Sequence, residues 1–220
     1  MGMKLYWSPR SPFVRKVMVV VHEAGLAGRV ETEAVRVTAT ETHPRVMAHN
    51  PLGKIPTLML DDGTAIYDSP VICEYLDTLH DGPPLLPRDP ATRLRSRRWE
   101  ALGDGLAETL LAWLGERFRQ QPGQSDSRIA VCRTKLAAIL SALEAEAADL
   151  DASPFCIGQA AIGAALAYLD FRFGDVTWRP DHPCLAAWHE AFSARPSAVA
   201  TAFWDELAAA AGPEPGTKGR

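Results

Sequence analysis

The sequence lacks several features that mark specialised classes of protein. No apolar run approaches the length needed to cross a bilayer, and the first residues contain no long apolar stretch of the kind found in signal peptides. Cysteine is scarce, and no two cysteines form a Cys-x-x-Cys pair; the four are Cys73, Cys132, Cys156 and Cys184. We therefore expect free thiols, a reducing cytoplasmic location and no membrane partner.

Patterns typical of metal sites and nucleic-acid surfaces are also missing. The six histidines include no helical pair with metal-ligand spacing, so we expect no metal. The formal net charge is -4, and the one basic cluster consists of Arg93, Arg95, Arg97 and Arg98. A nucleic-acid surface needs a concentrated basic face. We interpret this cluster as the solvated or subunit-facing side of a helix, and we expect no nucleic-acid partner.

The first 80 residues alternate between strand-like and helix-like segments. Strand patterns cover residues 4–7, 30–37, 57–60 and 65–67, and a helical pattern covers 12–24 and stops at Gly25. A second helix is expected to open at Asp68-Ser69-Pro70, with Ser69 as its N-cap. This order predicts an α/β domain over residues 1–80, in which helices cover a mixed sheet.

The remaining residues show helical patterning throughout. Four prolines within residues 81–90 exclude a regular helix or a central strand and predict a linker. Residues 91–211 are predicted to form an all-α domain, with a long first helix, a second helix capped by Ser127, and later helices at about 162–173, 183–194 and 197–210. Residues 212–220 have no apolar anchor, so we expect them to be disordered.

A short motif, Ser11-Pro12-Phe13-Val14, lies between the first strand and the first helix. Free N–H groups and the helix dipole favour negative charge at such a position. Thiol-disulfide proteins place Cys-Pro-x-Cys there. Serine and valine replace both cysteines, which excludes disulfide exchange by this site but leaves a hydroxyl that can donate to a thiolate. By itself, a serine at a helix start is more often only a cap.

Two further motifs carry polar groups that a ligand can use. Asn50-Pro51-Leu52-Gly53-Lys54-Ile55-Pro56 precedes the third strand. If the Ile55-Pro56 bond is cis, the backbone of Ile55 can pair with an extended peptide; a plain turn into the strand is an equal alternative. Asp68-Ser69 opens a helix whose amides and hydroxyl can hold a carboxylate, although Ser69 can also act only as a cap.

Together these motifs resemble the cytosolic glutathione S-transferases, in particular bacterial serine-type members. The resemblance also covers Pro70 to Leu76, Tyr168-Leu169-Asp170-Phe171-Arg172 and Arg195-Pro196-Ser197, in the family's order. It implies a thioredoxin-like N-terminal domain with a mixed four-stranded sheet, followed by an all-α C-terminal domain. It also implies glutathione as co-substrate and a homodimer, formed through the helix after Ser69 and the Arg-rich start of the long helix.

The resemblance also implies roles for individual residues. Ser11 corresponds to the serine that hydrogen-bonds the glutathione sulfur, and Ile55, ahead of a cis Pro56, to the residue whose backbone pairs with the cysteinyl part. Asp68 and Ser69 correspond to the pair that holds the γ-glutamyl end. Lys54 lies where members often place a polar contact to the peptide. His43 lies near a region that can touch the glycyl carboxylate, but we interpret it as plain surface.

The expected activity is a glutathione transferase that directs the thiolate at a small electrophile. One alternative is a non-catalytic glutathione-binding scaffold of the same fold. A second is a glutathione-dependent isomerase, although that subgroup usually has Ser-Ser-Cys where this chain has Ser11-Pro12-Phe13. A reductase would need cysteine at position 11. The electrophile is expected to bind between the domains. The residues that could line its site are Trp7, Arg10, Phe13, Trp113 and Phe118, although aromatic residues at helical spacing belong more often to the core.

The chain departs from the family in one place. Members usually have Ser or Thr, two residues, and then Asp at the start of the core helix of the second domain. We align these positions with Ala161 and Ala164, which removes both capping side chains. On this alignment, Ala161→Ser with Ala164→Asp is expected to stabilise the protein by roughly 1 kcal/mol.

Overall fold

The computed structural model describes residues 2–38 and 41–205. Its N-terminal half contains a four-stranded sheet of β1 (Met3–Trp7), β2 (Val30–Ala34), β3 (Thr57–Met59) and β4 (Ala65–Ile66), in the order β2-β1-β3-β4. β1 is parallel to β2 and antiparallel to β3, and β4 is antiparallel to β3. The predicted mixed sheet is confirmed. β2 ends three residues early because its last residue pairs with Trp7, where β1 ends.

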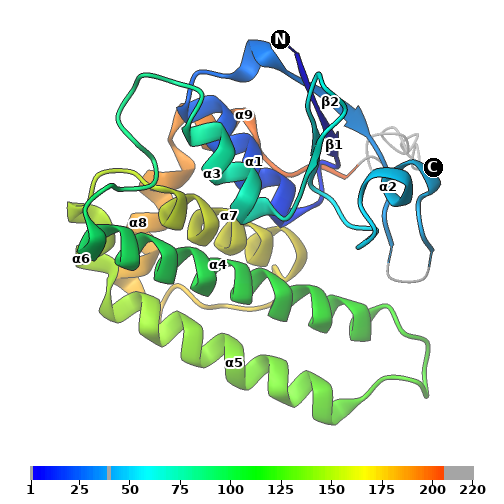
Figure 1. The fold of residues 1–220 in the computed structure, drawn as a ribbon. Helices are drawn as coiled ribbons and strands as arrows, with labels where there is room; N and C mark the ends of the chain where they lie inside the picture. Colours follow the sequence, from blue (N-terminus) through cyan, green and yellow to red (C-terminus); the bar gives the residue numbers. More distant parts are fainter. Residues whose placement is uncertain (1, 39–40, 206–220) are drawn as a thin grey trace, which may run out of the picture.

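Helices cover both faces of this sheet. α1 (Pro12–Glu23) and α3 (Ser69–Asp77) lie on one side of the strands and α2 (Pro44–His49) lies on the other (Figure 1). Alternation along β1 explains the two layers: Leu5 belongs to the main core with α1, whereas Tyr6 packs with Val46 of α2. α1 is followed by Gly25 at φ +69°, as predicted, and by a 3-10 turn at Ala27–Arg29.

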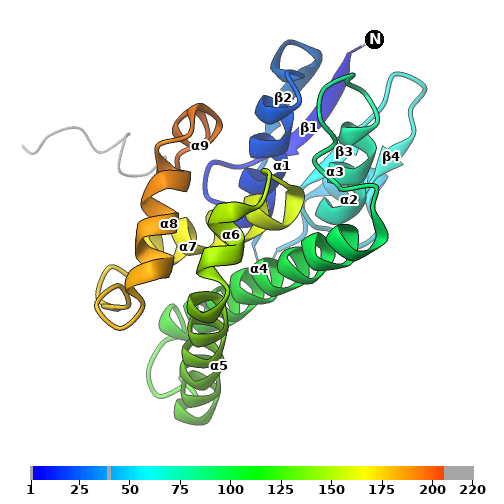
Figure 2. The same cartoon turned by 90° about the vertical axis from the view of Figure 1, so that its left-hand side faces the viewer.

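The C-terminal half is helical. Its elements are α4 (Pro90–Arg117), α5 (Asp126–Ala145), α6 (Ala147–Ala152), α7 (Ile157–Arg172), α8 (Pro183–Ser193) and α9 (Pro196–Ala200). α7 is buried along most of its length and packs against α1, α4 and α8. α9 lies beside α1, and α8 packs against α6 and α7 (Figure 2). In the described ranges, no helix combines the length and apolar character that crossing a membrane requires.

Several predicted helix boundaries are wrong. Asp68, not Ser69, is the N-cap of α3, and Ser125, not Ser127, is the N-cap of α5, where its Oγ accepts from Arg128 N at 3.4 Å. α7 begins at Ile157, five residues before the predicted start. α9 ends at Ala200, and residues 201–205 continue without helix. The end of that predicted helix, 206–210, and the tail at 212–220 lie outside the described residues.

The expectation that α7 lacks capping side chains is wrong. Cys156 is the N-cap, and Gln159 Oε1 accepts from Cys156 N at 3.2 Å while Nε2 donates to Leu150 O at 2.7 Å. Ala161 and Ala164 lie inside the helix, and both are buried. The expected stabilisation by Ser and Asp at these positions is therefore withdrawn, because their polar groups would enter the core.

Small residues let α4 and α7 cross closely. A Cβ placed on Gly103 of α4 would lie 2.5 Å from the backbone carbon of Ala161, and one on Gly158 of α7 would lie 2.4 Å from Ser96 O. Such distances leave no space for a methyl group. The alanines and glycines of α7 therefore set how near the long helix approaches.

Candidate functional site

The three sequence motifs meet at one end of the sheet. In the antiparallel register, Tyr6 of β1 lies opposite Thr57 of β3, and Leu58 lies opposite Ile66 of β4. The segment that follows β1, the segment that precedes β3 and the segment that follows β4 therefore lie at the same end of the strands. Ser11, Ile55-Pro56 and Asp68-Ser69 occupy those three segments.

Ser11 is the N-cap of α1, as its place before Pro12 predicts. Its backbone is extended, and its Oγ accepts from Val14 N at 3.3 Å. The hydroxyl proton has no acceptor within the described ranges, so Ser11 can cap the helix and still donate to an incoming group. The two interpretations of this serine, helix cap and donor to a ligand, are compatible.

The Ile55-Pro56 peptide bond is cis. The preceding loop is organised by buried Asn50, whose Nδ2 donates to Lys54 O at 3.1 Å and to Thr57 Oγ1 at 2.9 Å. Pro56 is buried and Ile55 is half-buried. The N–H and C=O of Ile55 form no hydrogen bond with any other residue described here. They remain available to an extended backbone. The side chain of Lys54 is exposed at the same place.

Asp68 and Ser69 form the start of α3. Asp68 is exposed, and its carboxylate accepts from Ser69 N; the peptide bond between Tyr67 and Asp68 is cis. Ser69 is fully buried, and its Oγ has no hydrogen-bond partner among the described residues. A buried hydroxyl without a partner is uncommon in native proteins and marks a position where an absent group can bind.

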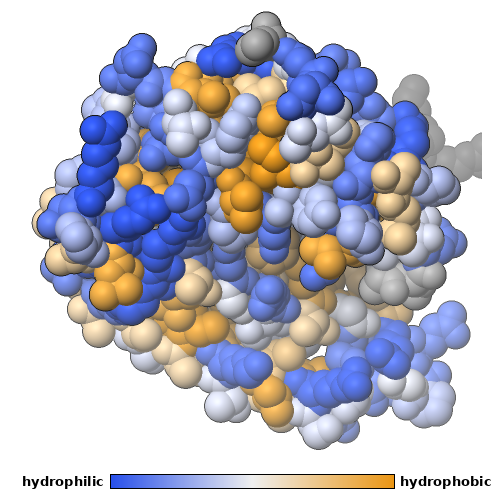
Figure 3. All heavy atoms as spheres, viewed as in Figure 1, coloured by the Kyte–Doolittle hydropathy of each residue, from blue (hydrophilic) through white to orange (hydrophobic). Residues whose placement is uncertain are grey.

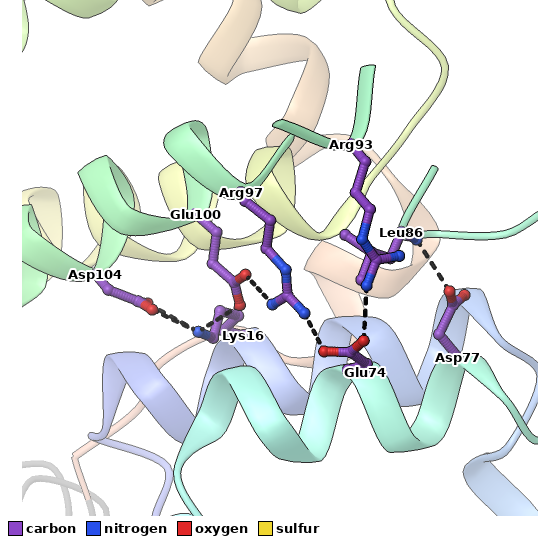
Figure 4. Close-up of polar contacts among 8 residues, drawn as sticks. All are labelled: Lys16, Glu74, Asp77, Leu86, Arg93, Arg97, Glu100 and Asp104. Carbon is purple, nitrogen blue, oxygen red and sulfur yellow. Dashed lines mark hydrogen bonds and ion pairs between the residues drawn. The ribbon is translucent and has the colours of Figure 1, made fainter. Parts of the chain in front are cut away.

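A charged cluster that the sequence analysis missed joins the two halves near this end (Figure 4). Lys16 Nζ of α1 lies 2.7 Å from Asp104 Oδ2 and 3.2 Å from Glu100 Oε1, both on α4. Burial disfavours the charged lysine, but the acidic neighbours outweigh it, so the pKa of Lys16 is raised. Cys73 lies in the same charged surroundings, and burial raises the pKa of its thiol to about 12, which leaves it a neutral, unreactive thiol.

The sequence contained only a weak signal for this charged cluster. Lys16 follows another cation, Arg15, in a mostly apolar helix pattern, and Glu100 and Asp104 are four residues apart, which places them on one face of a helix. Nothing in that spacing shows that the two halves meet there.

The arginine cluster at the start of α4 is already paired. Arg93 and Arg97 both contact Glu74 of α3, and Arg97 Nη1 also lies 2.8 Å from Glu100 Oε2 (Figure 4). Arg98 pairs with Glu146, and Arg95 lies over the ring of Trp99 at 5.2 Å. Arg93 and Arg97 therefore hold α4 against α3, and Arg98 holds it against Glu146, which precedes α6.

The other residues singled out from the sequence do not form one lining. Trp113 belongs to the core, where the centre of its ring lies 4.8 Å from that of Phe173. Phe118 is exposed, just beyond the end of α4. Arg10 pairs with Asp205 at 3.8 Å, and Trp7 lies beside Trp204. Phe13 is half-buried and packs against the main core.

His43, interpreted as surface, is half-buried as the N-cap of α2, and its Nδ1 has no described partner.

No cluster of acidic, His or Cys side chains fit to hold a metal ion occurs in the described part of the chain. The candidate site consists of hydroxyl and backbone groups, two of them at helix starts, together with the side chains of Lys54 and Asp68. Such groups bind an anionic, peptide-like molecule.

Comparison with known proteins finds relatives over most of the chain. A crystal structure of a glutathione transferase family member from Pseudomonas fluorescens Pf-5, with bound glutathione, is 41% identical, with a TM-score of 0.89; it covers 93% of this chain and all of that one. The uncharacterized GST-like protein YibF of Escherichia coli (strain K12) is 34% identical over 90% of this chain and 98% of its own length. A maleylacetoacetate isomerase from Pseudomonas aeruginosa is 35% identical over 46% of this chain and 48% of its own.

Both halves match descriptions of the same family. Residues 10–79 match "Glutathione S-transferase, N-terminal domain", and residues 97–191 match "Glutathione S-transferase, C-terminal domain". The sheet order, with α1 and α3 on one face, is that of the expected thioredoxin-like half. With nearly full-length similarity to YibF as well, the chain belongs to the glutathione S-transferase family.

Proposed function

We propose that this protein is a glutathione transferase in which Ser11 stabilises the glutathione thiolate for attack on a small electrophile. The observation that carries the proposal is the convergence of three unsatisfied polar groups at one end of the sheet. These are the Ser11 hydroxyl proton, the backbone of Ile55 and the buried Ser69 Oγ, each without a described partner for that group. Glutathione bound in the Pseudomonas fluorescens relative supports the same ligand here.

The proposed contacts divide the tripeptide into three parts. Ser11 donates to the sulfur, and the N–H and C=O of Ile55 pair with the cysteinyl backbone, next to the cis bond to Pro56. Asp68 receives the γ-glutamyl amino group, whereas the Ser69 hydroxyl donates to the γ-glutamyl carboxylate. Exposed Lys54 supplies a cation to the peptide. The polarity of each group fits its partner.

The chemistry requires a lower pKa for the thiol. A free thiol has a pKa of about 8.5, so only a few per cent is ionised at neutral pH. A hydrogen bond from Ser11 and the N-terminus of α1 both favour the charged form. The thiol proton leaves to solvent, the sulfur forms a bond to carbon, and the leaving group departs with the electron pair of its bond. Ser11 is neither the base nor the nucleophile.

The test is the pH profile of Ser11→Ala with glutathione and 1-chloro-2,4-dinitrobenzene. We expect kcat/KM to fall about 10- to 100-fold at pH 7, and we expect the deficit to shrink as pH approaches 9, where the thiol ionises without help. Ser8→Ala, three residues earlier in the same loop, is the matched control and keeps the wild-type profile. Equal activity of Ser11→Ala and wild type at every pH would refute the role of Ser11.

A glutathione-dependent isomerase is a second candidate, because the Pseudomonas aeruginosa relative carries that name. In that reaction the thiolate adds to a cis double bond and is expelled after rotation. Pro12 and Phe13 replace the Ser-Cys expected for that subgroup, which favours transfer over isomerisation. Isomerisation of maleylacetone, with no conjugation of the aryl halide, would support this second candidate. Binding of immobilised glutathione with neither activity would support a scaffold.

We further propose a division into residues 1–80 for glutathione, 81–90 as linker and 91–211 as the helical domain. Within the described residues, this division is supported by the absence of regular structure between Thr78 and Asp89, although Pro90 already begins α4. We also propose a cytoplasmic location, which the four free cysteines favour.

A homodimer is part of the same proposal. Val71 of α3 and Leu94 of α4 are 53% and 71% exposed, on the two elements named from the sequence. Figure 3 shows apolar patches between charged ones on the face that carries these helices. Sedimentation of wild type and of Val71→Asp with Leu94→Asp tests the dimer; we expect the double variant to sediment as a monomer.

A further inference from the structure

A pocket lies beside β1 on the side of β2, away from Ile55 and Ser69. It has a volume of about 350 Å³, and its walls come from the end of β1, α1, β2 and the segment around α9. The residues that matter for its chemistry are Trp7, Ser8, Arg15, Met18, Thr32 and Trp204. Figure 2 shows α9 on the same side of the molecule as α1, against which it packs. This volume is at the lower end of the range for small-molecule pockets.

Arg15 is the unusual member of this lining. It is 92% buried, since 8% of its surface is exposed, yet no carboxylate in the described ranges pairs with it. Its Nη2 donates to Ala198 O at 3.2 Å, and its guanidinium lies 4.6 Å from the ring centre of Phe203. Nε has no hydrogen-bond partner, and Nη1 donates to no described residue. Burial lowers the pKa of Arg15 to about 10, which leaves it charged at neutral pH.

A buried cation without a counter-charge is costly, and a bound anion would offset that cost. The surroundings favour such an anion. Arg15 is the one charged side chain among the described residues that line the pocket, and no carboxylate lines it; Arg10 and Arg172 pair with Asp205 outside the lining. The hydroxyls of Ser8 and Thr32 can donate to the same anion.

The rest of the pocket is apolar and aromatic. The rings of Trp7 and Trp204 are 6.3 Å apart and tilted by 46°, and Met18 adds a flexible thioether. Trp204 is 46% exposed, which is unusual for so large an apolar side chain. A flat ring between these side chains would cover apolar surface that is now open to water.

We propose that this pocket binds a small aromatic carboxylate, with its carboxylate at Arg15 and its ring beside Trp7 and Trp204. Ile55 and Ser69 adjoin β3 and β4, on the opposite side of β1 from β2, whereas Ser8 of the lining lies in the loop that leads to Ser11, whose N–H donates to Ser8 O at 3.3 Å. None of the residues assigned to glutathione lines the pocket. The proposal therefore does not depend on the proposed catalysis.

The test uses isothermal titration of the full chain with 2-naphthoate and with 2-naphthalenemethanol, which has the same ring and no charge. We expect the carboxylate to bind at least tenfold more tightly, with or without saturating glutathione. Arg15→Met keeps the apolar stem but removes the charge, and should weaken naphthoate binding at least tenfold. Arg15→Lys should retain part of it. Arg29→Met, at an exposed arginine that donates to Leu79 O, is the matched control and keeps wild-type affinity.

Three outcomes would overturn the proposal: equal affinity for the acid and the alcohol, unchanged affinity in Arg15→Met, or displacement of naphthoate by glutathione. If Arg15→Met does not fold, a crystal structure of the wild-type protein with 2-naphthoate decides. The carboxylate must then lie within about 3.5 Å of the Arg15 guanidinium. Loss of transferase activity in Ser11→Ala leaves this prediction unaffected, so the two proposals can fail independently.

Discussion

The ammonium group of Lys16 lies 2.7 Å from Asp104 Oδ2, although the two residues belong to different halves of the chain. Lys16 is 1% exposed, and its second partner, Glu100, is 3% exposed. α1, which begins at the candidate catalytic Ser11, is therefore fixed to α4 by a buried ion cluster. Burial raises the pKa of Asp104, with Lys16 acting against that shift, and Asp68 is among the charges that affect Asp104.

We expect Lys16→Met to destabilise the protein by about 3 kcal/mol, because it leaves half-buried Asp104 without its cation and buried Glu100 with Arg97 alone. A triple variant that adds Glu100→Gln and Asp104→Asn should recover at least half of this loss. Urea unfolding at neutral pH measures both. Lys135→Met, at an exposed lysine of α5, serves as the control with wild-type stability. Equal stability of the single and triple variants would show that charge burial is not the cause.

We expect Ser69→Ala to weaken glutathione binding about tenfold, which corresponds to one hydrogen bond to a charged group. Folding stability should not fall, because the Ser69 hydroxyl has no described partner to lose. Ser96→Ala is a close control, since Ser96 Oγ on α4 is also buried without a described partner. Titration calorimetry should show unchanged glutathione affinity for Ser96→Ala, and the assignment of Ser69 fails if both variants bind alike.

Two glycines of α4 should respond in opposite directions to alanine. A Cβ at Gly103 would lie 2.5 Å from backbone of α7, whereas a Cβ at Gly105 meets no atom within 4 Å. Gly105→Ala should stabilise the protein by about 0.5–1 kcal/mol through helix propensity. Gly103→Ala should cost about 1–3 kcal/mol, because α4 and α7 must separate. Thermal melts of the two variants compare them, and a gain in both would contradict the close crossing.

Stability should fall in mild acid because of His189. Burial lowers the pKa of this histidine to about 4 from 6.5, and Asp170, 3.7 Å away, offsets only part of that effect. Between these values the unfolded chain binds more protons than the folded one, so stability is complete above pH 6.5 and is lost as pH falls toward 4. At pH 5 the loss is about 2 kcal/mol. Urea midpoints of His189→Gln should change less between pH 7.5 and pH 5 than those of wild type; identical slopes would rule out His189 as the source.

The cap of α7 can be tested at Gln159. Its side chain accepts from Cys156 N and donates to Leu150 O, and it is buried. Gln159→Ala should destabilise the protein by about 2 kcal/mol, since it removes one cap and leaves a buried carbonyl unpaired. Gln159→Glu keeps the acceptor and loses the donor, so its melting temperature should lie between those of wild type and Gln159→Ala. A value for Gln159→Ala equal to wild type would mean that this cap is unimportant.

The sequence was most informative where local chemistry decides the structure. Proline at the first position of α1 and α8, and Gly25 after α1, marked helix ends that the structure confirms, whereas Pro70 lies at the second position of α3. Aligning Ala161 and Ala164 with the cap of α7 failed because α7 is apolar all round, so its periodicity does not indicate where it begins. Cys156 and Gln159 are an unusual capping pair, and nothing in their spacing marks them beforehand.

By itself the sequence determined the order of the four strands and of the longer helices, but not the short helices α2 and α6. It also determined the Ser11, Ile55-Pro56 and Asp68-Ser69 motifs, and the family that their order resembles. Those features depend on residues close together in the chain, where helix caps, proline and strand alternation act locally. Only the tertiary structure decided which side chains meet across the two halves: Lys16 with Asp104, Glu74 with the arginines of α4, and Arg15 with the C-terminal segment. These pairings depend on how α1 and α3 pack against the C-terminal helices. No residue spacing within the sequence indicates which side chains that packing brings together.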